Sequence, residues 1–273
     1  MSNPNSISPE KLARLIGTPK CPVLVDVCTT EDFAADPRLI PGSIRRPFEA
    51  VAEWAPEFSG KSSIVICQKG QKLSQGVAAW LRHAGATSSD SLEGGQLGWG
   101  AAGLPLVPAA KMPKQDSRGR TLWVTRSRPK IDRIACPWLI RRFVDASAVF
   151  LFVSPAEVPG VAARFGATPF DIDDVFWSHR GETCTFDTML AEWRLETAAL
   201  KRLALIVRAA DTARLDLAPE AHGLLAASLG LSRMYADDLE QLEAGMALYD
   251  AFYRWCRDAT DETHNWPAKK AGA

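Results

Sequence analysis

The first third of the chain alternates short apolar runs with amphipathic stretches. Val23–Val27 and Ile64–Ile66 are rich in β-branched residues, which predicts two buried strands. Each run is followed by a stretch with helical spacing, which covers residues 73–84 in the second case. The glycines of residues 94–100 predict tight turns. Strands that alternate with helices are typical of a parallel sheet with helices on both faces, so an α/β fold is expected here.

Helical spacing dominates the second half. Strands are expected over residues 121–125 and 149–153, with a helix between them over residues 136–144. Beyond them, apolar positions recur every three or four residues, which predicts helices over residues 186–193, 196–210, 218–229 and 237–256. The last helix is expected to bury a face made of Leu239, Leu242, Met246, Tyr249, Phe252, Tyr253 and Cys256. These elements predict an α+β, mainly helical domain.

A change in composition separates the two halves. Residues 108–120 hold two prolines and several charged residues, with few side chains that could pack. The length of 273 residues suits about two domains. We therefore expect a first domain at 1–110, a linker at 111–120, a second domain at 121–258 and a polar tail at 259–273.

Composition narrows the functional classes. Lys+Arg and Asp+Glu are both 32, and this neutral balance argues against nucleic-acid binding. No uncharged apolar run reaches the roughly 18 residues of a membrane helix, and the polar start, Met1–Glu10, lacks the apolar segment of a secretory signal. Six cysteines without a CxxC pair argue against a disulfide framework and a thiolate zinc cluster. A reduced, cytoplasmic protein without membrane or nucleic-acid partners is expected.

One cysteine has a distinctive position. Cys67 ends the second apolar run and is followed by a turn and then a helix. Helix N-termini and concave loops of backbone amides attract anions, and they favour the thiolate form of a cysteine. The sequence therefore predicts a nucleophilic thiol, although a buried, inert cysteine at the end of a strand is the alternative. The residues that would contact its substrate are Gln68, Lys69, Gly70, Gln71 and Lys72.

Residues 23–107 resemble a rhodanese (sulfurtransferase) domain. The resemblance rests on four segments in order, namely Val25-Asp26-Val27, Ile40-Pro41-Gly42-Ser43-Ile44, the six-residue loop from Cys67 to Lys72, and Leu92-Glu93-Gly94-Gly95 with Trp99 and Gly103-Leu104-Pro105. It implies that Cys67 attacks the outer sulfur of thiosulfate or a similar donor and holds it as a persulfide. The loop amides would cradle the sulfur, Lys69 and Lys72 would attract the donor, and no cofactor would be required.

The loop departs from the rhodanese pattern at three positions. Cys28 stands where the family usually has an arginine, and Lys72 replaces the arginine that ends the loop. Leu73 stands at the usual serine position, so one hydroxyl is lost unless Ser74 substitutes for it. Lysine lacks the bidentate fork of arginine, which predicts weaker turnover of thiosulfate.

A basic segment opens the second half. Arginines and a lysine precede Cys136-Pro137, and proline suits the first position of a helix. If the helix begins there, Cys136 is its cap and the segment attracts oxyanions. If it begins at Ile131, Pro137 is tolerated inside the helix and Cys136 is packed in the core. The sequence leaves both starts open.

A second cluster contains residue types that bind metals. Asp171-Ile172-Asp173-Asp174 precedes His179, Glu182 and Cys184, and the candidate metal ligands are His179 and Cys184. The spacing between that histidine and that cysteine matches no dedicated zinc finger. A third group, Arg208 to Arg214, ends an apolar helix. Taken together, the candidate site of the second domain comprises Arg126, Arg128, Asp132, Arg133, Cys136, His179, Cys184 and Asp211.

Residues 121–257 resemble the C-terminal domain of bacterial chromate-resistance proteins. The resemblance rests on residues 123–143, Ser178-His179, Cys184-x-Phe186, Val207-Arg208-x-Ala210-Asp211-Thr212, Leu229-Gly230-Leu231-Ser232 and Tyr249-Asp250. It implies a role in chromate stress, with chromate as a ligand. We therefore expect a sulfurtransferase or persulfide carrier coupled to oxyanion stress. The alternatives are a chromate-responsive regulator or accessory protein with a weak rhodanese domain, and a thiol-dependent oxyanion reductase.

Overall fold

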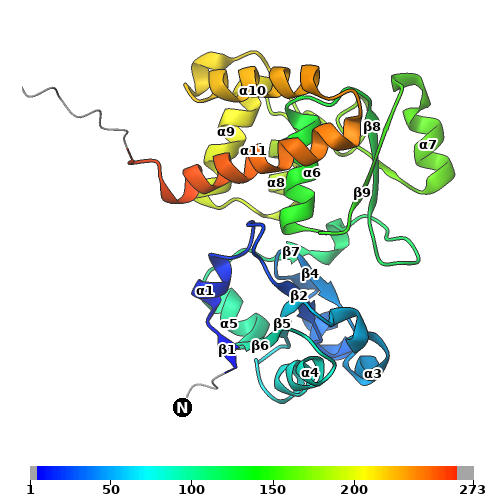
Figure 1. Cartoon of the computed structure of the whole chain (residues 1–273), viewed down its shortest axis with the longest axis vertical. Helices are drawn as coiled ribbons and strands as arrows, with labels where there is room; N and C mark the ends of the chain where they lie inside the picture. Colours follow the sequence, from blue (N-terminus) through cyan, green and yellow to red (C-terminus); the bar gives the residue numbers. More distant parts are fainter. Residues whose placement is uncertain (1–4, 263–273) are drawn as a thin grey trace, which may run out of the picture.

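The computed structural model describes residues 5–262, which form the two domains of Figure 1. The first domain holds a five-stranded, all-parallel sheet in the order β1-β6-β5-β2-β4. Its strands are β1 (Ser6–Ile7), β2 (Val23–Asp26), β4 (Ser43–Arg45), β5 (Ser62–Ile66) and β6 (Ser88–Leu92). The short pair β3 (Arg38–Leu39) and β7 (Val107–Pro108) is antiparallel. The run that ends at Ile66 is thus the central strand, as its apolar character predicts.

Helices cover both faces of this sheet. They are α1 (Pro9–Ala13), α2 (Thr30–Ala35), α3 (Val51–Trp54), α4 (Lys72–His83) and α5 (Gly95–Ala101). On one face, Leu81 of α4 shares a core with Val65 of β5. On the other, Leu12 of α1 and Trp99 of α5 share a core with Ile66. The expected α/β fold with helices on both faces is confirmed.

The prediction of tight turns is confirmed at Gly94, which lies in a turn with φ 68°, but it is wrong for residues 95–100, which α5 occupies. Glycine disfavours a helix, and that propensity misled the sequence argument. The glycines serve close packing instead. A Cβ on Gly95 would lie 2.1 Å from the carbonyl oxygen of Cys67, and one on Gly98 would lie 3.1 Å from that of Glu93. Tertiary contact therefore overrides local propensity here.

The second domain is mainly helical, as predicted. Its three-stranded parallel sheet has the order β10-β8-β9 and comprises β8 (Leu122–Arg126), β9 (Val149–Val153) and β10 (Thr168–Pro169). Its helices are α6 (Asp132–Phe143), α7 (Val158–Phe165), α8 (Thr185–Trp193), α9 (Ala198–Asp211), α10 (Ala221–Met234) and α11 (Asp238–Asp258). On α11, most of the expected apolar face is buried, but Leu239 is 50 % exposed because it lies in the exposed first turn.

The structure decides where α6 begins. Asp132 is its first residue, so Pro137 lies inside the helix and Cys136 is fully buried. The predicted helix start at Cys136 is therefore wrong, and the alternative start at Ile131 differs from the observed start by one residue. The entry into α6 is strained, since Ile131 has φ 40°. Burial of Ile134, Trp138 and neighbouring side chains on most sides of α6 stabilises it despite the internal proline.

The two domains share a hydrophobic core. Leu12 and Ile16 of the first domain belong to the same buried cluster as Phe143 and Tyr253 of the second. A Cβ on Gly17 would lie only 2.3 Å from the Phe143 ring. The domains are therefore packed directly against each other, with α11 reaching toward α1 in Figure 1.

No helix within residues 5–262 combines the length and apolar character needed to cross a membrane. α11 ends at Asp258, and most of the tail expected over 259–273 lies outside the described residues.

Candidate functional site

Cys67 lies directly after the central strand β5, where the chain turns into α4. Its side chain is buried, with 5 % of its surface exposed. The Cys67 thiol donates to Oγ of Ser74 over 3.3 Å, and that hydroxyl donates to the carbonyl of Gln71 over 3.1 Å. Ser74 therefore supplies the hydroxyl that the leucine at position 73 lacks.

The loop after Cys67 is held by its carbonyls and leaves its amides free. The carbonyls of Cys67 and Gln68 accept hydrogen bonds of 3.0 and 3.1 Å from the amides of Gln96 and Leu97, which begin α5. By contrast, the amides of residues 68–72 donate to no acceptor in the described part of the chain. A run of unpaired amides beside a thiol is a site for an anion or a thiolate.

Two glycines make this arrangement possible. Gly70 has φ 68°, and a Cβ there would lie 2.3 Å from the carbonyl oxygen of Leu92. Gly95 approaches the loop from the other side, against the carbonyl of Cys67. The loop and the Gly94–Gly95 segment are therefore in backbone-to-backbone contact, which leaves no room for a side chain at Gly70 or Gly95.

Cys67 lines a surface pocket of about 240 Å³. The pocket is also lined by Asp32, Gln68, Lys69, Gln71, Lys72 and Leu73. Both lysines are exposed, so they place positive charge at the mouth. Asp32, from the first turn of α2, places a negative charge on the same rim. Gly70, the remaining residue of the predicted site, supports the loop from behind.

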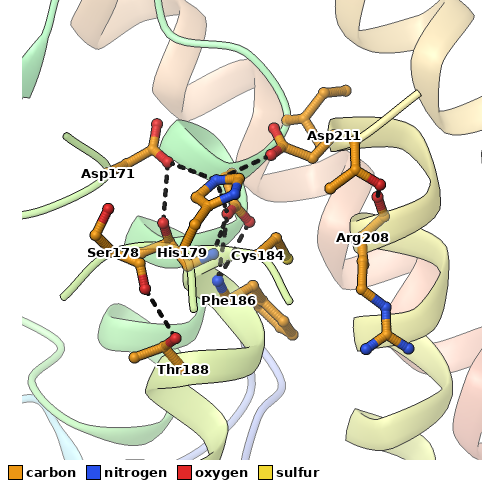
Figure 2. Close-up of polar contacts among 12 residues, drawn as sticks. Asp171, Ser178, His179, Cys184, Phe186, Thr188, Arg208 and Asp211 are labelled. Atoms are coloured by element: carbon orange, nitrogen blue, oxygen red, sulfur yellow. Dashed lines mark hydrogen bonds and ion pairs between the residues drawn. The ribbon is translucent and has the colours of Figure 1, made fainter. Parts of the chain in front are cut away.

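A second cluster surrounds His179 in the other domain (Figure 2). Its Nε2 lies 3.3 Å from Asp171 Oδ1, 3.3 Å from Asp211 Oδ2 and 3.6 Å from Asp132 Oδ2. The four residues come from four segments, which are the start of α6, the chain after β10, the loop before α8 and the end of α9. The side chain of His179 is 41 % exposed, whereas Asp132 is fully buried.

Hydrogen bonds hold two of the carboxylates of this cluster in place. Asp132 accepts hydrogen bonds from the backbone amides of Thr185, at 2.6 Å, and Phe186, at 3.3 Å. These amides lie in the first turn of α8, where they have no acceptor within the helix. Asp171 accepts a hydrogen bond of 2.9 Å from the hydroxyl of Thr185. Burial, together with the nearby charges of the other two carboxylates, raises the pKa of Asp132 well above its usual value. The carboxylates in turn raise the pKa of His179 to about 10.

Both halves of the chain match known families. Residues 8–102 match the family described as rhodanese-like domain. Residues 123–256 match the family described as ChrB, C-terminal domain. The chain joins a rhodanese-like domain to a ChrB C-terminal domain.

Individual proteins are similar to parts of the chain. Protein ChrB of Cupriavidus metallidurans is 34 % identical over 156 residues, which cover 55 % of this chain and 46 % of that protein. The chain thus spans less than half the length of this relative. A solved structure from Staphylococcus saprophyticus is 27 % identical and covers 37 % of this chain and 97 % of its own, with a TM-score of 0.32. A rhodanese-related protein from Thermoplasma volcanium is 25 % identical and covers 38 % and 97 %, with a TM-score of 0.33.

In the rhodanese-like domain, the position without the usual arginine has a different cation nearby. Arg45 of β4 pairs with buried Asp26 over 3.0 Å and donates to the carbonyl of Cys28 over 3.1 Å. The Cys28 thiol donates to Oε1 of Gln96 over 3.5 Å. Burial and the charge of Asp26 raise the pKa of Cys28 far above its usual value, so this thiol stays protonated at neutral pH.

In the ChrB C-terminal domain, only some of the predicted site residues come together. Asp132, His179 and Asp211 converge, and Arg126 and Arg133 pair with Asp171 over 3.5 and 3.3 Å. Asp171 is the member that the sequence argument did not single out, since nothing in the pattern distinguished it from the two aspartates that follow.

The remaining predicted residues of this domain have structural roles. Arg128 donates to backbone carbonyls at the end of α10, including that of Tyr235 over 3.0 Å. Cys184 is the N-cap residue of α8, and its thiol donates to Asp187 over 3.3 Å. Burial raises the pKa of the thiols of Cys136 and Cys184 well above their usual values. Both are protonated core thiols, so the expectation that Cys136 caps a helix in an oxyanion site is wrong.

Proposed function

We propose that Cys67 carries sulfane sulfur as a persulfide, and that this chemistry serves the response to chromate. The observation that carries the proposal is the thiol at the end of β5, facing a pocket whose loop amides have no protein acceptor. Such a loop stabilises the negative charge of both a thiolate and a persulfide. The rhodanese-like family assignment supports the same chemistry.

The reaction would proceed in two displacements. The Cys67 thiolate attacks the outer sulfur of thiosulfate, the sulfur–sulfur bond of the donor breaks, and sulfite leaves with the electron pair. The outer sulfur of the resulting persulfide is then attacked by a second nucleophile, which returns the thiolate. Lys69 and Lys72 would draw the dianionic donor to the pocket, while Asp32 on the same rim opposes it.

The chromate part of the proposal rests on the second domain. Residues 123–256 belong to the ChrB C-terminal family, and the chain is similar to Protein ChrB over 55 % of its length. Chromate and thiosulfate are both tetrahedral dianions, so one protein could meet both kinds of ligand. The domains are packed through a common core, which supports a joint role of the two domains.

Thiosulfate and cyanide test the sulfur chemistry. The full chain should form thiocyanate, and mass spectrometry should find one added sulfur atom on the peptide that contains Cys67. Cys67→Ala should abolish both signals, whereas Cys21→Ala, which removes a thiol outside the loop, should leave them unchanged. Thiocyanate formation no faster than in Cys67→Ala would refute the proposal.

Growth on chromate tests the biological role. Expression of the full chain in a chromate-sensitive bacterium should raise the tolerated chromate concentration, and Cys67→Ala should lose this protection at an equal protein level. Equal protection by both forms would separate chromate tolerance from the chemistry of Cys67 and would contradict the proposed coupling.

A further inference from the structure

We propose that Asp132, His179 and Asp211 bind one divalent transition-metal ion in the ChrB C-terminal domain. One ligand atom from each of these three residues lies within 4.8 Å of the other two. They come from separate segments and converge on one point, as Figure 2 shows for His179 and Asp211. The site involves no cysteine, and it is independent of the sulfur chemistry proposed for Cys67.

The distances fit a metal better than a proton. A charge-assisted N–H···O bond is about 2.7–2.9 Å long, and one Nε2–H cannot donate well to several carboxylates at once. His179 Nε2 lies 3.6 Å from Asp132 and 3.3 Å from Asp211. In a tetrahedral site with bonds of about 2.1 Å, neighbouring ligand atoms lie about 3.4 Å apart. The observed spacing therefore leaves room for an ion between the three side chains.

The charges point the same way. Asp171 has its own cations, since Arg126 and Arg133 both pair with it. Asp132 and Asp211, by contrast, form ion pairs within 4.0 Å only with His179 among the described residues, and Arg133 acts on both from a greater distance. Within residues 5–262, neither of these two carboxylates has an ion pair with a guanidinium group, and a divalent ion at this point would contact both of them.

The donor set indicates the kind of ion. Imidazole nitrogen suits first-row transition ions such as Zn²⁺, Fe²⁺ and Ni²⁺, and carboxylates also suit Mn²⁺, whereas Mg²⁺ and Ca²⁺ prefer all-oxygen sites. Three protein ligands leave at least one coordination position open, which is the arrangement of catalytic rather than structural metal sites. A pocket of about 370 Å³ is lined by Thr212, next to Asp211, and by Gly181, two residues after His179, but by none of the three ligands. The side chain of His179 is 41 % exposed, so the ion would reach the cluster directly from solvent.

Mn²⁺ binding to the metal-free full chain tests the site. Mn²⁺ is the probe because it binds thiols weakly and the chain has six cysteines. We expect one equivalent to bind, seen as loss of the free Mn²⁺ signal in electron paramagnetic resonance, with a nitrogen coupling from the imidazole. An excess of Mg²⁺ should not displace it. Zn²⁺ should compete for the same equivalent.

Two ligand variants and two matched controls make the test specific. His179→Gln and Asp211→Asn should each weaken Mn²⁺ binding by at least about 100-fold, since loss of even an outer-shell partner costs about 10- to 100-fold. Both side chains are partly exposed, so these variants should fold, and circular dichroism checks this. His222→Gln and Asp216→Asn alter exposed residues and should bind as the parent chain does.

The outcomes are distinct. Loss of the nitrogen coupling in His179→Gln alone would place the imidazole on the ion. Absence of stoichiometric Mn²⁺ and Zn²⁺ binding by the folded parent chain would overturn the proposal, and so would binding that survives unchanged in both ligand variants. Neither result would bear on the sulfur transfer proposed for Cys67, because that reaction is tested separately by thiocyanate formation.

Discussion

Replacement of Gly95 by alanine should disable the Cys67 loop from its rear side. The added Cβ would lie 2.1 Å from the carbonyl oxygen of Cys67 and 2.5 Å from the amide nitrogen of Gly70, where an ordinary contact is 3.4 Å or more. The loop must therefore move by more than about 1 Å, and a displacement of this size can cost about 100-fold in rate. Crowding of this kind also lowers the free energy of unfolding by roughly 1–3 kcal/mol.

Gly103→Ala is the matched control for this variant. Gly95 has φ 59° and Gly103 has φ 69°, so alanine is strained by about 1–2 kcal/mol at either position. A Cβ on Gly103, however, would meet nothing within 4 Å. Urea unfolding and thiocyanate formation should show Gly103→Ala mildly destabilised with near-parental turnover, and Gly95→Ala impaired in both. Equal losses in the two variants would refute the claim that backbone contact positions the loop.

Three further predictions concern packing and thiol reactivity. Gly17→Ala should lower the melting temperature more than Gly60→Ala does. Both glycines have a positive φ, but only a Cβ at Gly17 would meet aromatic rings of the other domain. Equal melting temperatures of the two variants would argue against a tight contact between the domains. Asp145→Ala should lower the free energy of unfolding in urea by roughly 2–4 kcal/mol, because this buried carboxylate accepts four hydrogen bonds from two residues. A decrease of less than about 1 kcal/mol would contradict this prediction. Iodoacetamide at about pH 8 should label Cys67 before Cys28, Cys136 and Cys184, as followed by mass spectrometry. The pKa of each of these three thiols is raised in the folded protein, so they stay neutral and unreactive at that pH. Labelling of any of the three as fast as Cys67 would contradict this prediction.

The Cys67 loop could be predicted from the sequence because its signals are local. A β-branched run, a cysteine, a glycine turn and an amphipathic helix follow one another within residues 62–83, and the structure places them in that order. The function of Ser74 could be stated only as an alternative, since a shift of one residue along the chain does not show where a hydroxyl points. The hydrogen bond to Cys67 resolves this point.

The two errors in helix assignment have a common cause. Over residues 95–100 and at Pro137, residues with poor helix propensity suggested a turn or a helix start, and in both places the chain is helical. In α5 the glycines permit contact with the loop, and in α6 burial on nearly all sides outweighs the missing hydrogen bond. Propensity is a local quantity, whereas both helices are fixed by contacts with distant parts of the chain.

The same limitation reverses the expected chemistry of the second domain. The basic residues from Arg126 to Arg133 suggested an anion site because they are dense in the sequence. In the structure, Arg126 and Arg133 both pair with Asp171, and Arg128 donates to the carbonyls that end α10. Two further carboxylates, Asp132 and Asp211, lie 79 positions apart in the sequence and meet at His179. The density of basic residues along the chain predicts an anion site, whereas in space carboxylates from distant segments take up this positive charge and surround the imidazole.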